Sequence, residues 1–471
     1  MYGKILFITP PVGLSQGRVR KPPSSYHPLH FGFLSASARE AGVRADLLDG
    51  YTLALSGEKV LDEIRKRNPD VIGLSGTTAS IKSSYTLSRL IRENNIDAKI
   101  ILGGVHVTSL YMDMLGEKSR GPEGVRTRLF REELDTNPTI DHIFIGEADH
   151  TLKRFLSGEI KGRVIVSDPV SDLDALSIPA YDLFLPFHFF NPSPHLSGGN
   201  IMPMVTSRGC AYNCDYCSVS ETQGRRYRYR SARSVVDEIA YLKEKESVRS
   251  ISFREGDFTS NRNRLLDFCR LLREEKMGIT WNCNAHINHL TPGMVSEMRK
   301  SGCMNVQVGI EFGNDERRAR FKGGNVTNDK IRDVIELCKN AGISVHAYSL
   351  FGMEGETKAY MRDTIRFARE IDTDSAVFAV AIPQPSTRFY NRCIDRNAIR
   401  TFDWNQYDVP DRDIYEPGQV RLKVIKRYAR RAGWAFYMRP KKMFGFLKAV
   451  KSPGDLFHFF RLFNKYLLGV K

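Results

Sequence analysis

Short apolar runs alternate with amphipathic stretches along most of the chain, and this alternation constrains the fold more than any other feature. In the N-terminal part we predict five strands, at residues 4–9, 44–49, 70–75, 98–103 and 141–146. A second series of six strands follows, at residues 202–206, 249–254, 279–284, 304–310, 343–350 and 375–381. Amphipathic helices are predicted between the later strands, at residues 232–245, 261–274, 291–300, 328–340 and 356–370. Strands that alternate with helices favour parallel sheets, so we predict an α/β protein with two sheets.

The length of 471 residues is too great for one ordinary core and predicts two or three domains. We predict a flavodoxin-like doubly wound parallel sheet in residues 1–160, a linker in 161–200, and a partial (β/α)6 TIM-like barrel in 201–390. A basic, mostly helical C-terminal region completes the chain at 391–471, and the charged residues 118–137 are predicted to be a surface insertion. The N-terminus has only a short apolar run, which predicts a strand rather than a signal peptide, so we expect a cytoplasmic protein.

Glycine and small polar residues follow the strands of the first series. In an open doubly wound sheet, ligands bind at the carboxyl ends of the strands, and glycines there allow close approach of a large flat ligand. The pattern therefore predicts a cofactor site in the first domain. Its candidate residues are Pro10, Ser75, Thr77, Gly103, Gly104, Gly146 and Glu147.

Three cysteines stand close together in one stretch of the second series, Cys210, Cys214 and Cys217. Three thiolates in one short loop can hold three irons of a [4Fe-4S] cluster and leave the fourth iron open for a chelating ligand. A zinc knuckle is the alternative, but it normally needs a further Cys or His pair at regular spacing, and none follows nearby. The remaining cysteines are predicted to be small buried residues: Cys269, Cys283, Cys303, Cys338 and Cys393.

The cysteine triplet resembles the signature of radical S-adenosylmethionine (SAM) enzymes. The segments 254–259, 281–283, 301–303, 309–313 and 350–357 follow it in the order and spacing typical of that family. The first domain, with its segments 103–108 and 145–149, is similar to the cobalamin-binding domain that precedes the radical SAM domain in one large subgroup, which includes methyltransferases and the anaerobic cyclase of chlorophyll synthesis.

The resemblance implies three cofactors, namely a [4Fe-4S] cluster, SAM and cobalamin, and a 5′-deoxyadenosyl radical formed from SAM. Tyr216 corresponds to the residue whose backbone contacts adenine, and Gly352 ends a strand where the backbone approaches adenine, although a turn also needs glycine. Glu255 and Asp257 are placed to accept from the SAM ammonium, and Glu311 from the ribose hydroxyls, although carboxylates at strand ends also serve as helix caps.

Two further expectations concern ligands. The chain has no D-x-H-x-x-G segment and His106 is not placed like the histidine that ligates cobalt, so cobalamin is expected without a protein imidazole. The alternative is a first domain kept for packing alone. His346 and Tyr348 alternate on one predicted strand and are candidates to face the substrate, while Arg388 is a candidate to bind a carboxylate. The resemblance implies no fixed catalytic acid or base.

The resemblance implies methyl transfer through cobalamin to an unactivated carbon or a phosphinate of a small-molecule or lipid-like substrate. The alternative is an oxidative cyclase or ring-rearrangement enzyme without net methylation. A methylthiotransferase would carry further cysteines in its first domain, and this chain has none before Cys210. We expect an electron donor of the flavodoxin or ferredoxin type and no nucleic-acid partner.

The net charge of +16 is concentrated at the C-terminal end. Residues 421–471 contain fourteen Lys or Arg, one acidic residue, Asp455, and eleven aromatic residues. This composition predicts contact with a membrane surface or a lipid-like substrate. A helical cap over the barrel with a solvated basic face explains it equally well. Docking of an acidic electron donor is a third possibility.

Overall fold

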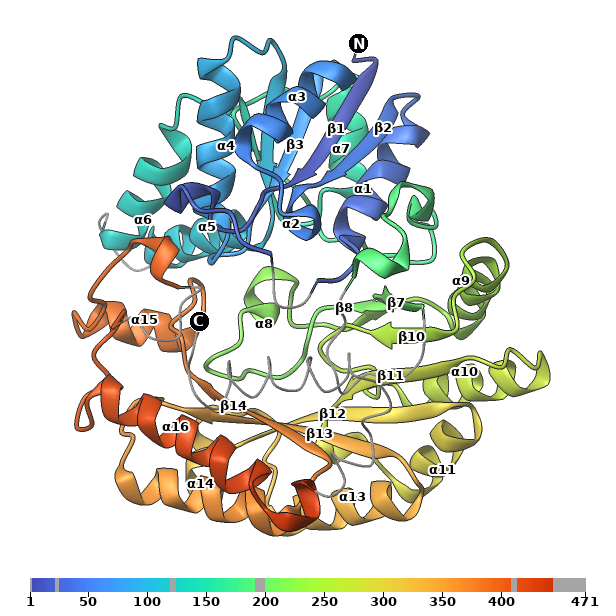
Figure 1. Cartoon of the computed structure of the whole chain (residues 1–471), viewed down its shortest axis with the longest axis vertical. Helices are drawn as coiled ribbons and strands as arrows, with labels where there is room; N and C mark the ends of the chain where they lie inside the picture. Colours follow the sequence, from blue (N-terminus) through green and yellow to red (C-terminus); the bar gives the residue numbers. More distant parts are fainter. Residues whose placement is uncertain (1, 22–24, 119–123, 191–199, 408–412, 444–471) are drawn as a thin grey trace.

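The computed structural model describes the whole chain except residues 1, 22–24, 119–123, 191–199, 408–412 and 444–471. Its first sheet has six parallel strands in the order β2-β1-β3-β4-β5-β6, which is a doubly wound, flavodoxin-like arrangement. The strands are β1 (Lys4–Thr9), β2 (Arg44–Asp49), β3 (Val71–Ser75), β4 (Lys99–Gly103), β5 (His142–Ile145) and β6 (Val164–Val166). Helices surround this sheet in the upper half of Figure 1, namely α1 (Leu29–Glu40), α2 (Gly50–Leu53), α3 (Gly57–Arg67), α4 (Ile81–Glu93), α5 (Val105–Lys118), α6 (Val125–Phe130) and α7 (Asp149–Leu156).

The central strands of this sheet are apolar because helices cover both of their faces. In β1 the four consecutive residues from Ile5 to Ile8 are all buried, and they join cores on opposite sides of the sheet. Polar caps set the starts of the helices. In α3, for example, the Ser56 hydroxyl accepts a hydrogen bond from the backbone N–H of Lys59.

Two features of the first half differ from the sequence expectation. The short edge strand β6 lies inside the range that was predicted to be a linker. The sequence did not predict it because three residues are too few to show a strand pattern. The surface insertion predicted at 118–137 is wrong for its described part: α6 and the π-helical turn Arg131–Asp135 bury Leu129, Phe130 and Leu134.

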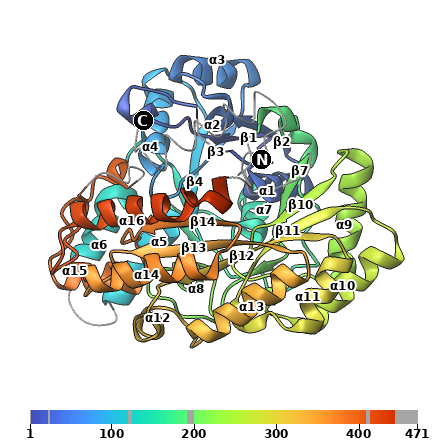
Figure 2. The same cartoon turned by 60° about the horizontal axis from the view of Figure 1, so that its bottom comes forward.

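The second sheet is an open, parallel, six-stranded partial barrel in the order β7-β10-β11-β12-β13-β14. Its strands are β7 (Ile201–Met204), β10 (Ser250–Phe253), β11 (Thr280–Ala285), β12 (Cys303–Glu311), β13 (Ser344–Phe351) and β14 (Ser375–Val380). Figure 2 shows helices covering its outer face, among them α9 (Ala232–Lys245), α10 (Arg262–Glu274), α11 (Pro292–Lys300), α12 (Asp315–Phe321), α13 (Asn328–Asn340) and α14 (Lys358–Ile371). A two-stranded ladder of β8 (Ser207–Arg208) and β9 (Arg228–Tyr229), with α8 (Val219–Thr222) between them in sequence, lies between the two sheets (Figure 1).

The C-terminal region packs on both halves. Helix α15 (Arg388–Asp395) and the 3₁₀ helix Trp404–Gln406 contact the first half, where the Trp404 indole donates to Glu133 over 2.5 Å. Helix α16 (Leu422–Tyr437) covers β14, and the Tyr437 hydroxyl bonds both the N–H and the C=O of Ala376. Its basic side chains at Arg427, Arg430 and Arg431 are exposed, as expected for a helical cap, whereas residues 444–471 lie outside the described part.

Within the described ranges, none of the helices combines the length and apolar character needed to span a bilayer.

Candidate cofactor site between the two sheets

The three predicted cluster ligands lie in the loop that follows β8. Cys210, Cys214 and Cys217 are half-buried and form no disulfide. Gly209 starts the loop with a φ of 86°, and a Cβ there would lie 2.1 Å from the carbonyl oxygen of Arg226. Only glycine fits this turn, because the backbone conformation and the space both exclude a side chain.

Hydrogen-bonding groups from the loop and from a second segment lie beside the thiols. The backbone N–H of Gly323 donates to Cys214 Sγ over 3.3 Å, and the Tyr227 hydroxyl lies 3.4 Å from Cys210 Sγ. Burial raises the pKa of Cys217 to about 11 and also raises the pKa of Cys214. A bound metal ion deprotonates a thiol whatever its pKa in the metal-free protein. Three thiols in one loop, with hydrogen-bonding groups beside them, fit an iron–sulfur cluster.

Among the described residues, no three His, Cys, Asp or Glu side chains lie close enough together to hold a single metal ion. The fit of the cysteines to a cluster therefore rests on their loop and on its hydrogen bonds.

A segment that the sequence reasoning missed packs against this loop. It comprises Lys322, Gly323 and Gly324, directly after α12. A Cβ on Gly323 would lie 2.9 Å from the backbone N of Asn213, and one on Gly324 would lie 2.7 Å from His286 Cε1. The adjacent glycine pair was the only signal in the sequence, and its position close to the cysteines depends on the fold.

Asp257 belongs to a hydrogen-bonded chain that reaches the cysteine loop. His289 Nδ1 lies 2.7 Å from its carboxylate, and His289 Nε2 lies 2.9 Å from the hydroxyl of Tyr212, which stacks on His286. Burial raises the pKa of Asp257, but the hydrogen bond and charge of His289 outweigh it and lower this pKa below its ordinary value. The Asp257 carboxylate is therefore already engaged in the protein.

Glu255 has an acceptor to spare. One oxygen accepts a hydrogen bond from the Thr206 hydroxyl over 2.5 Å, whereas Oε2 is buried without a hydrogen-bond partner among the described residues. Burial raises the pKa of this carboxyl group. A buried oxygen without a hydrogen-bond partner destabilises the fold. Glu255 is therefore a better candidate than Asp257 to accept a hydrogen bond from a bound ligand.

Glu311 ends β12 in a strained conformation. Its φ is 63°, at a register shift between β12 and β13, and its carboxylate lies 3.5 Å from Lys322 Nζ. A non-glycine residue in this region costs roughly 1–3 kcal/mol, and such residues cluster at ligand sites. Burial and the charge of nearby Glu311 raise the pKa of Tyr216 well above its ordinary value.

The structure explains Gly352 by packing. Its φ is 91°, and a Cβ would lie 2.6 Å from the Tyr415 hydroxyl, which donates to the Gly352 carbonyl over 2.7 Å. The Gly352 N–H donates to Glu356, and buried Arg317 donates to the carbonyl of Met353. The turn thus requires this glycine, and its contact with adenine stays a prediction.

The residues predicted to bind a cofactor in the first domain follow its strands at one edge of the sheet. Gly104 has a φ of 107°, and a Cβ there would meet Ser75 Oγ at 2.7 Å, whereas a Cβ on Gly103 would meet nothing closer than 3.7 Å. Pro10 is buried after β1, and Thr77 is exposed beyond β3. Gly146 follows β5 with a φ of 84°. These residues thus gather at the carboxyl ends of the strands, where ligands of doubly wound sheets bind, and their contact with a cofactor stays a prediction.

His106 is held inside the protein near the start of α5. It is fully buried, lies 3.1 Å from the Thr78 hydroxyl and packs edge-on against Trp404. That cobalamin binds without a protein imidazole stays a prediction.

Glu147 instead links the two sheets. It accepts from Arg228 over 2.5 Å, from Arg208 over 2.9 Å and from the backbone N–H of Val170 over 3.0 Å. Asp149 also pairs with Arg208, over 2.7 Å. Since Arg208 lies two residues before Cys210, these ion pairs hold the carboxyl edge of the first sheet against the cysteine loop. The carboxylate of Glu147 therefore links the two sheets, and its contact with a cofactor stays a prediction.

The inner face of the barrel carries a ladder of polar side chains. The Tyr348 hydroxyl donates to Gln307 over 2.6 Å, the Gln307 amide donates to Asn282 over 3.3 Å, and the Ser252 hydroxyl donates to Asn282 over 2.9 Å. Their sequence neighbours, such as Val308, belong to the apolar core beneath the helices. Alternation along a strand places the polar ladder on the opposite, inner face.

Two other candidates are differently placed. His346 is buried with Nδ1 2.7 Å from the Ser375 hydroxyl, so it supports the sheet. Arg388 is half-exposed and lies 3.9 Å from Asp215, within the cysteine loop. The five cysteines outside the triplet are all buried, as predicted.

Comparisons with known proteins agree with this arrangement. A model of the B12 binding domain matches residues 16–132, and a model of the radical SAM superfamily matches residues 204–368. An uncharacterized methyltransferase of Pyrococcus horikoshii is 27% identical, with 93% of each chain covered. An anaerobic magnesium-protoporphyrin IX monomethyl ester cyclase of Rubrivivax gelatinosus is 23% identical and covers 83% of this chain and 71% of its own length. The solved structure of the radical SAM methyltransferase TsrM of Kitasatospora setae, with cobalamin and a [4Fe-4S] cluster bound, shares the fold with a TM-score of 0.63 at 16% identity, covering 84% of this chain and 78% of its own.

Proposed function

Because the chain belongs to the cobalamin-binding radical SAM enzymes, we propose that it transfers a methyl group to an unactivated carbon or a phosphinate of a small-molecule or lipid-like substrate. Its cofactors are a [4Fe-4S] cluster, SAM and cobalamin. When bound, they supply radical chemistry and the capacity to carry a methyl group. The observation that supports the proposal most is the pairing of Glu147 and Asp149 with Arg208, because it brings the candidate cobalamin edge next to the cysteine loop.

The side chains of the second domain divide the binding of SAM and the cluster between them. Cys210, Cys214 and Cys217 hold the cluster. When SAM binds, Glu255 would accept from its ammonium through Oε2, which has no hydrogen-bond partner among the described residues, and Glu311 would accept from the ribose hydroxyls. Asp257 acts instead by holding Tyr212 through His289, which positions the cluster loop.

The polar ladder inside the barrel limits the substrate class. Barrel interiors are usually filled by branched apolar residues, whereas here Ser252, Asn282, Gln307 and Tyr348 face inward. These groups already bond one another, and their remaining lone pairs and N–H groups can also bind neutral polar groups of a substrate. We therefore propose that the reacting part of the substrate carries neutral hydrogen-bonding groups, even if the rest of the molecule is lipid-like.

A ring-forming reaction without net methylation is the second candidate, because the relatives include a magnesium-protoporphyrin cyclase. In either case an electron donor of the flavodoxin or ferredoxin type delivers the electron that the cluster requires.

Anaerobic purification and reconstitution test the proposal. We expect UV-visible and EPR spectra of a four-iron cluster and of bound base-off cobalamin, and formation of both 5′-deoxyadenosine and S-adenosylhomocysteine by mass spectrometry. The variant Cys214→Ala should lose the cluster and both products, whereas Cys338→Ala, at a buried core position, should keep them. Formation of 5′-deoxyadenosine without S-adenosylhomocysteine would favour the cyclase-type reaction, and absence of cobalamin binding would refute methyl transfer through cobalamin.

A further inference from the structure

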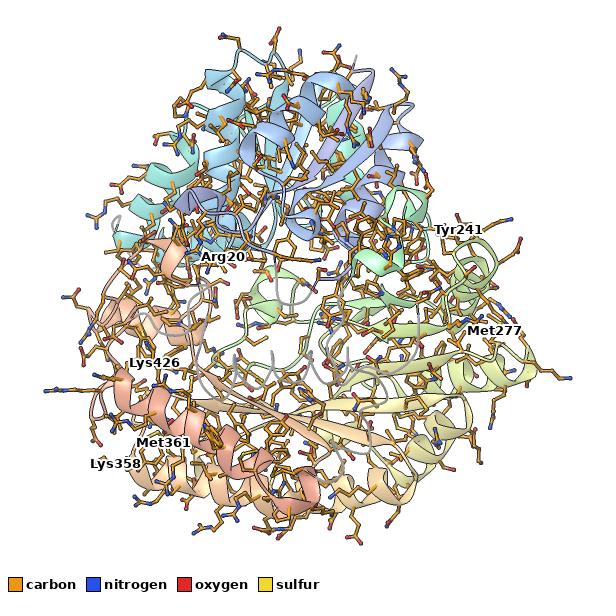
Figure 3. All side chains as sticks on the ribbon, viewed as in Figure 1. Arg20, Tyr241, Met277, Lys358, Met361 and Lys426 are labelled. Atoms are coloured by element: carbon orange, nitrogen blue, oxygen red, sulfur yellow. The ribbon has the colours of Figure 1, made fainter. Side chains whose placement is uncertain are left out.

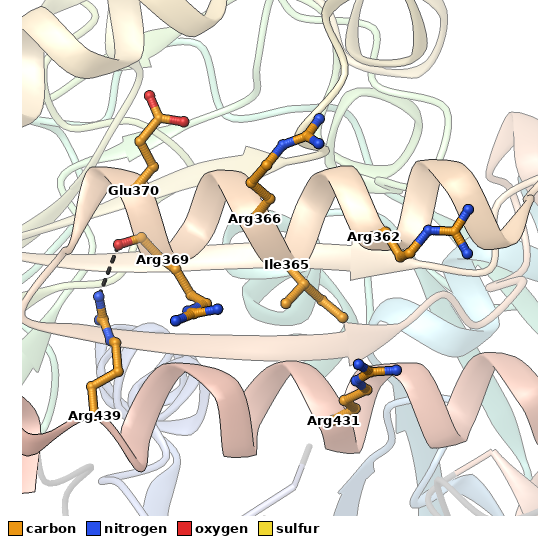
Figure 4. Close-up of a pocket in the computed structure, with 7 residues that line it drawn as sticks. All are labelled: Arg362, Ile365, Arg366, Arg369, Glu370, Arg431 and Arg439. Carbon is orange, nitrogen blue, oxygen red and sulfur yellow. Dashed lines mark hydrogen bonds between the residues drawn. The ribbon is translucent and has the colours of Figure 1, made fainter.

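Arginines gather in a groove on the outer face of the barrel, between α14 and α16. The groove has a volume of about 590 Å³ and is lined by five arginines, one glutamate and one isoleucine. Figure 4 shows Arg369 and Arg431 reaching into the gap between the two helices, with Ile365 beside them. Met361, labelled in Figure 3, lies in the packed core between these helices together with Ile425 and Ala429. This core fixes the spacing of the two helices and hence of the arginines.

The positive charge of the groove is only partly neutralised within the protein. Three of the lining residues have partners: Glu370 pairs with Arg332, Arg366 with Asp363, and Arg439 with Asp372. The side chains of Arg362, Arg369 and Arg431 have no ion pair or hydrogen bond within the described residues, and all three are exposed. Like charges held close together repel one another, so an anion from outside the chain would stabilise this arrangement.

We propose that this groove docks the protein on an anionic membrane surface. Guanidinium groups bind phosphate oxygens in a bidentate manner, which suits phospholipid headgroups. The chain leaves the groove at Arg439 and continues through Lys441 and Lys442 into residues 444–471. Those residues contain five Lys or Arg, one Asp and seven aromatic residues, a composition typical of segments that lie at a membrane interface.

The position of the groove favours a membrane over an acidic electron donor. Helices α14 and α16 cover the outside of β13 and β14, whereas the cysteine loop lies on the other side of this sheet, between the two halves (Figure 1). A donor docked in the groove would face away from the cluster that it must reduce. The inference does not depend on the methyl transfer proposed above.

Vesicle co-sedimentation of the full-length protein tests the inference. We expect binding to phosphatidylcholine vesicles that contain phosphatidylglycerol, weakening with added salt, and little binding to pure phosphatidylcholine vesicles. Replacement of Arg369 and Arg431 by glutamate should lower the partition coefficient at least about thirtyfold, which corresponds to about 1 kcal/mol for each arginine near the surface. The matched control replaces Arg89 and Arg262 by glutamate. These two are exposed on α4 and α10 without a partner among the described residues, and their replacement should change binding less than about twofold.

Several results would overturn the inference. Equal losses in the two double variants would assign the binding to net charge alone, and equal binding to neutral vesicles would remove the role of the headgroup charge. Abolition of vesicle binding by inorganic phosphate, at an ionic strength where chloride has no effect, would identify a site for a free anion. If the groove variants bound vesicles normally but their cluster were no longer reduced by an acidic flavodoxin, the groove would instead bind a protein partner.

Two checks separate this test from failures of folding or catalysis. The Arg369→Gln, Arg431→Gln variant removes charge without reversing it and should lower binding about thirtyfold. Both groove variants should keep the cluster spectrum and SAM cleavage, because the groove lies outside the candidate cofactor site.

Discussion

Replacement of Glu147 by glutamine removes one negative charge from the contact between the first sheet and the cysteine loop, without a change in side-chain size. The side chains of Glu147, Arg208 and Arg228 are only 10%, 14% and 15% exposed. Removal of one partner from a buried ion pair costs about 3–5 kcal/mol, and a hydrogen bond to a charged group contributes about 1.5–3 kcal/mol. Because Asp149 still pairs with Arg208 in the variant, we expect a loss at the lower end, about 3 kcal/mol in the free energy of unfolding.

Urea denaturation followed by tryptophan fluorescence measures this loss. The control is Glu159→Gln, whose carboxylate pairs with Arg154 over 3.4 Å with both side chains about 60% exposed, so the expected loss is below about 1 kcal/mol. Burial raises the pKa of Glu147, but Arg228 and Arg208 outweigh it and hold this pKa below its ordinary value. A lowered pKa means that the stabilisation is present above about pH 4.3, the ordinary value for glutamate, and is lost as the pH falls further. Equal losses in the two variants, or a difference from wild type that does not shrink in acid, would refute the reasoning.

Three further predictions concern single positions. Glu311→Gln should weaken SAM binding to the reconstituted protein about tenfold or more by equilibrium dialysis, because it removes a charged acceptor, and unchanged affinity would exclude that contact. Burial raises the pKa of Asp113 to about 7, so its stabilisation of the fold is complete below pH 4 and is lost as the pH rises through 7. Asp113→Asn should remove this dependence from urea denaturation curves, and a wild-type profile that is flat over this range would contradict it. Gly324→Ala should lower the free energy of unfolding by about 1–3 kcal/mol more than Gly158→Ala, and it should also reduce cluster incorporation. Both glycines have a positive φ, but only Gly324 is crowded. Equal effects of the two substitutions would show that crowding beside the cysteine loop is unimportant.

The strands could be predicted because local patterns define them. All eleven predicted strands occur, and the predicted helix 232–245 coincides with α9. By contrast, β6 is too short to show a pattern. Around α6, the buried apolar residues Leu129, Phe130 and Leu134 are surrounded by charged residues in the sequence, so their helical spacing was not recognised. The charges of this stretch are used in the interior: Arg126 pairs with Asp395 over 2.6 Å, and Glu133 accepts from Trp404.

The contacts that build the site are long-range, and this explains what the sequence could not supply. The cysteine motif predicts Cys210, Cys214 and Cys217 as cluster ligands from local spacing alone. Which of two neighbouring carboxylates has an oxygen to spare depends on Thr206 and His289, which lie some distance away in the chain. Likewise, Glu147 follows a strand like a ligand residue, and only the approach of two arginines from the second half shows that it links the sheets.

The contact between Tyr437 and Ala376 has a consequence for solubility. An open barrel ends in a strand whose backbone groups invite pairing with another chain, and β14 is such an edge. The single tyrosine hydroxyl occupies both the N–H and the C=O of Ala376, and α16 lies over the rest of the strand. A variant that ends before α16 would therefore expose the edge strand β14 and self-associate, whether or not the cofactors are bound.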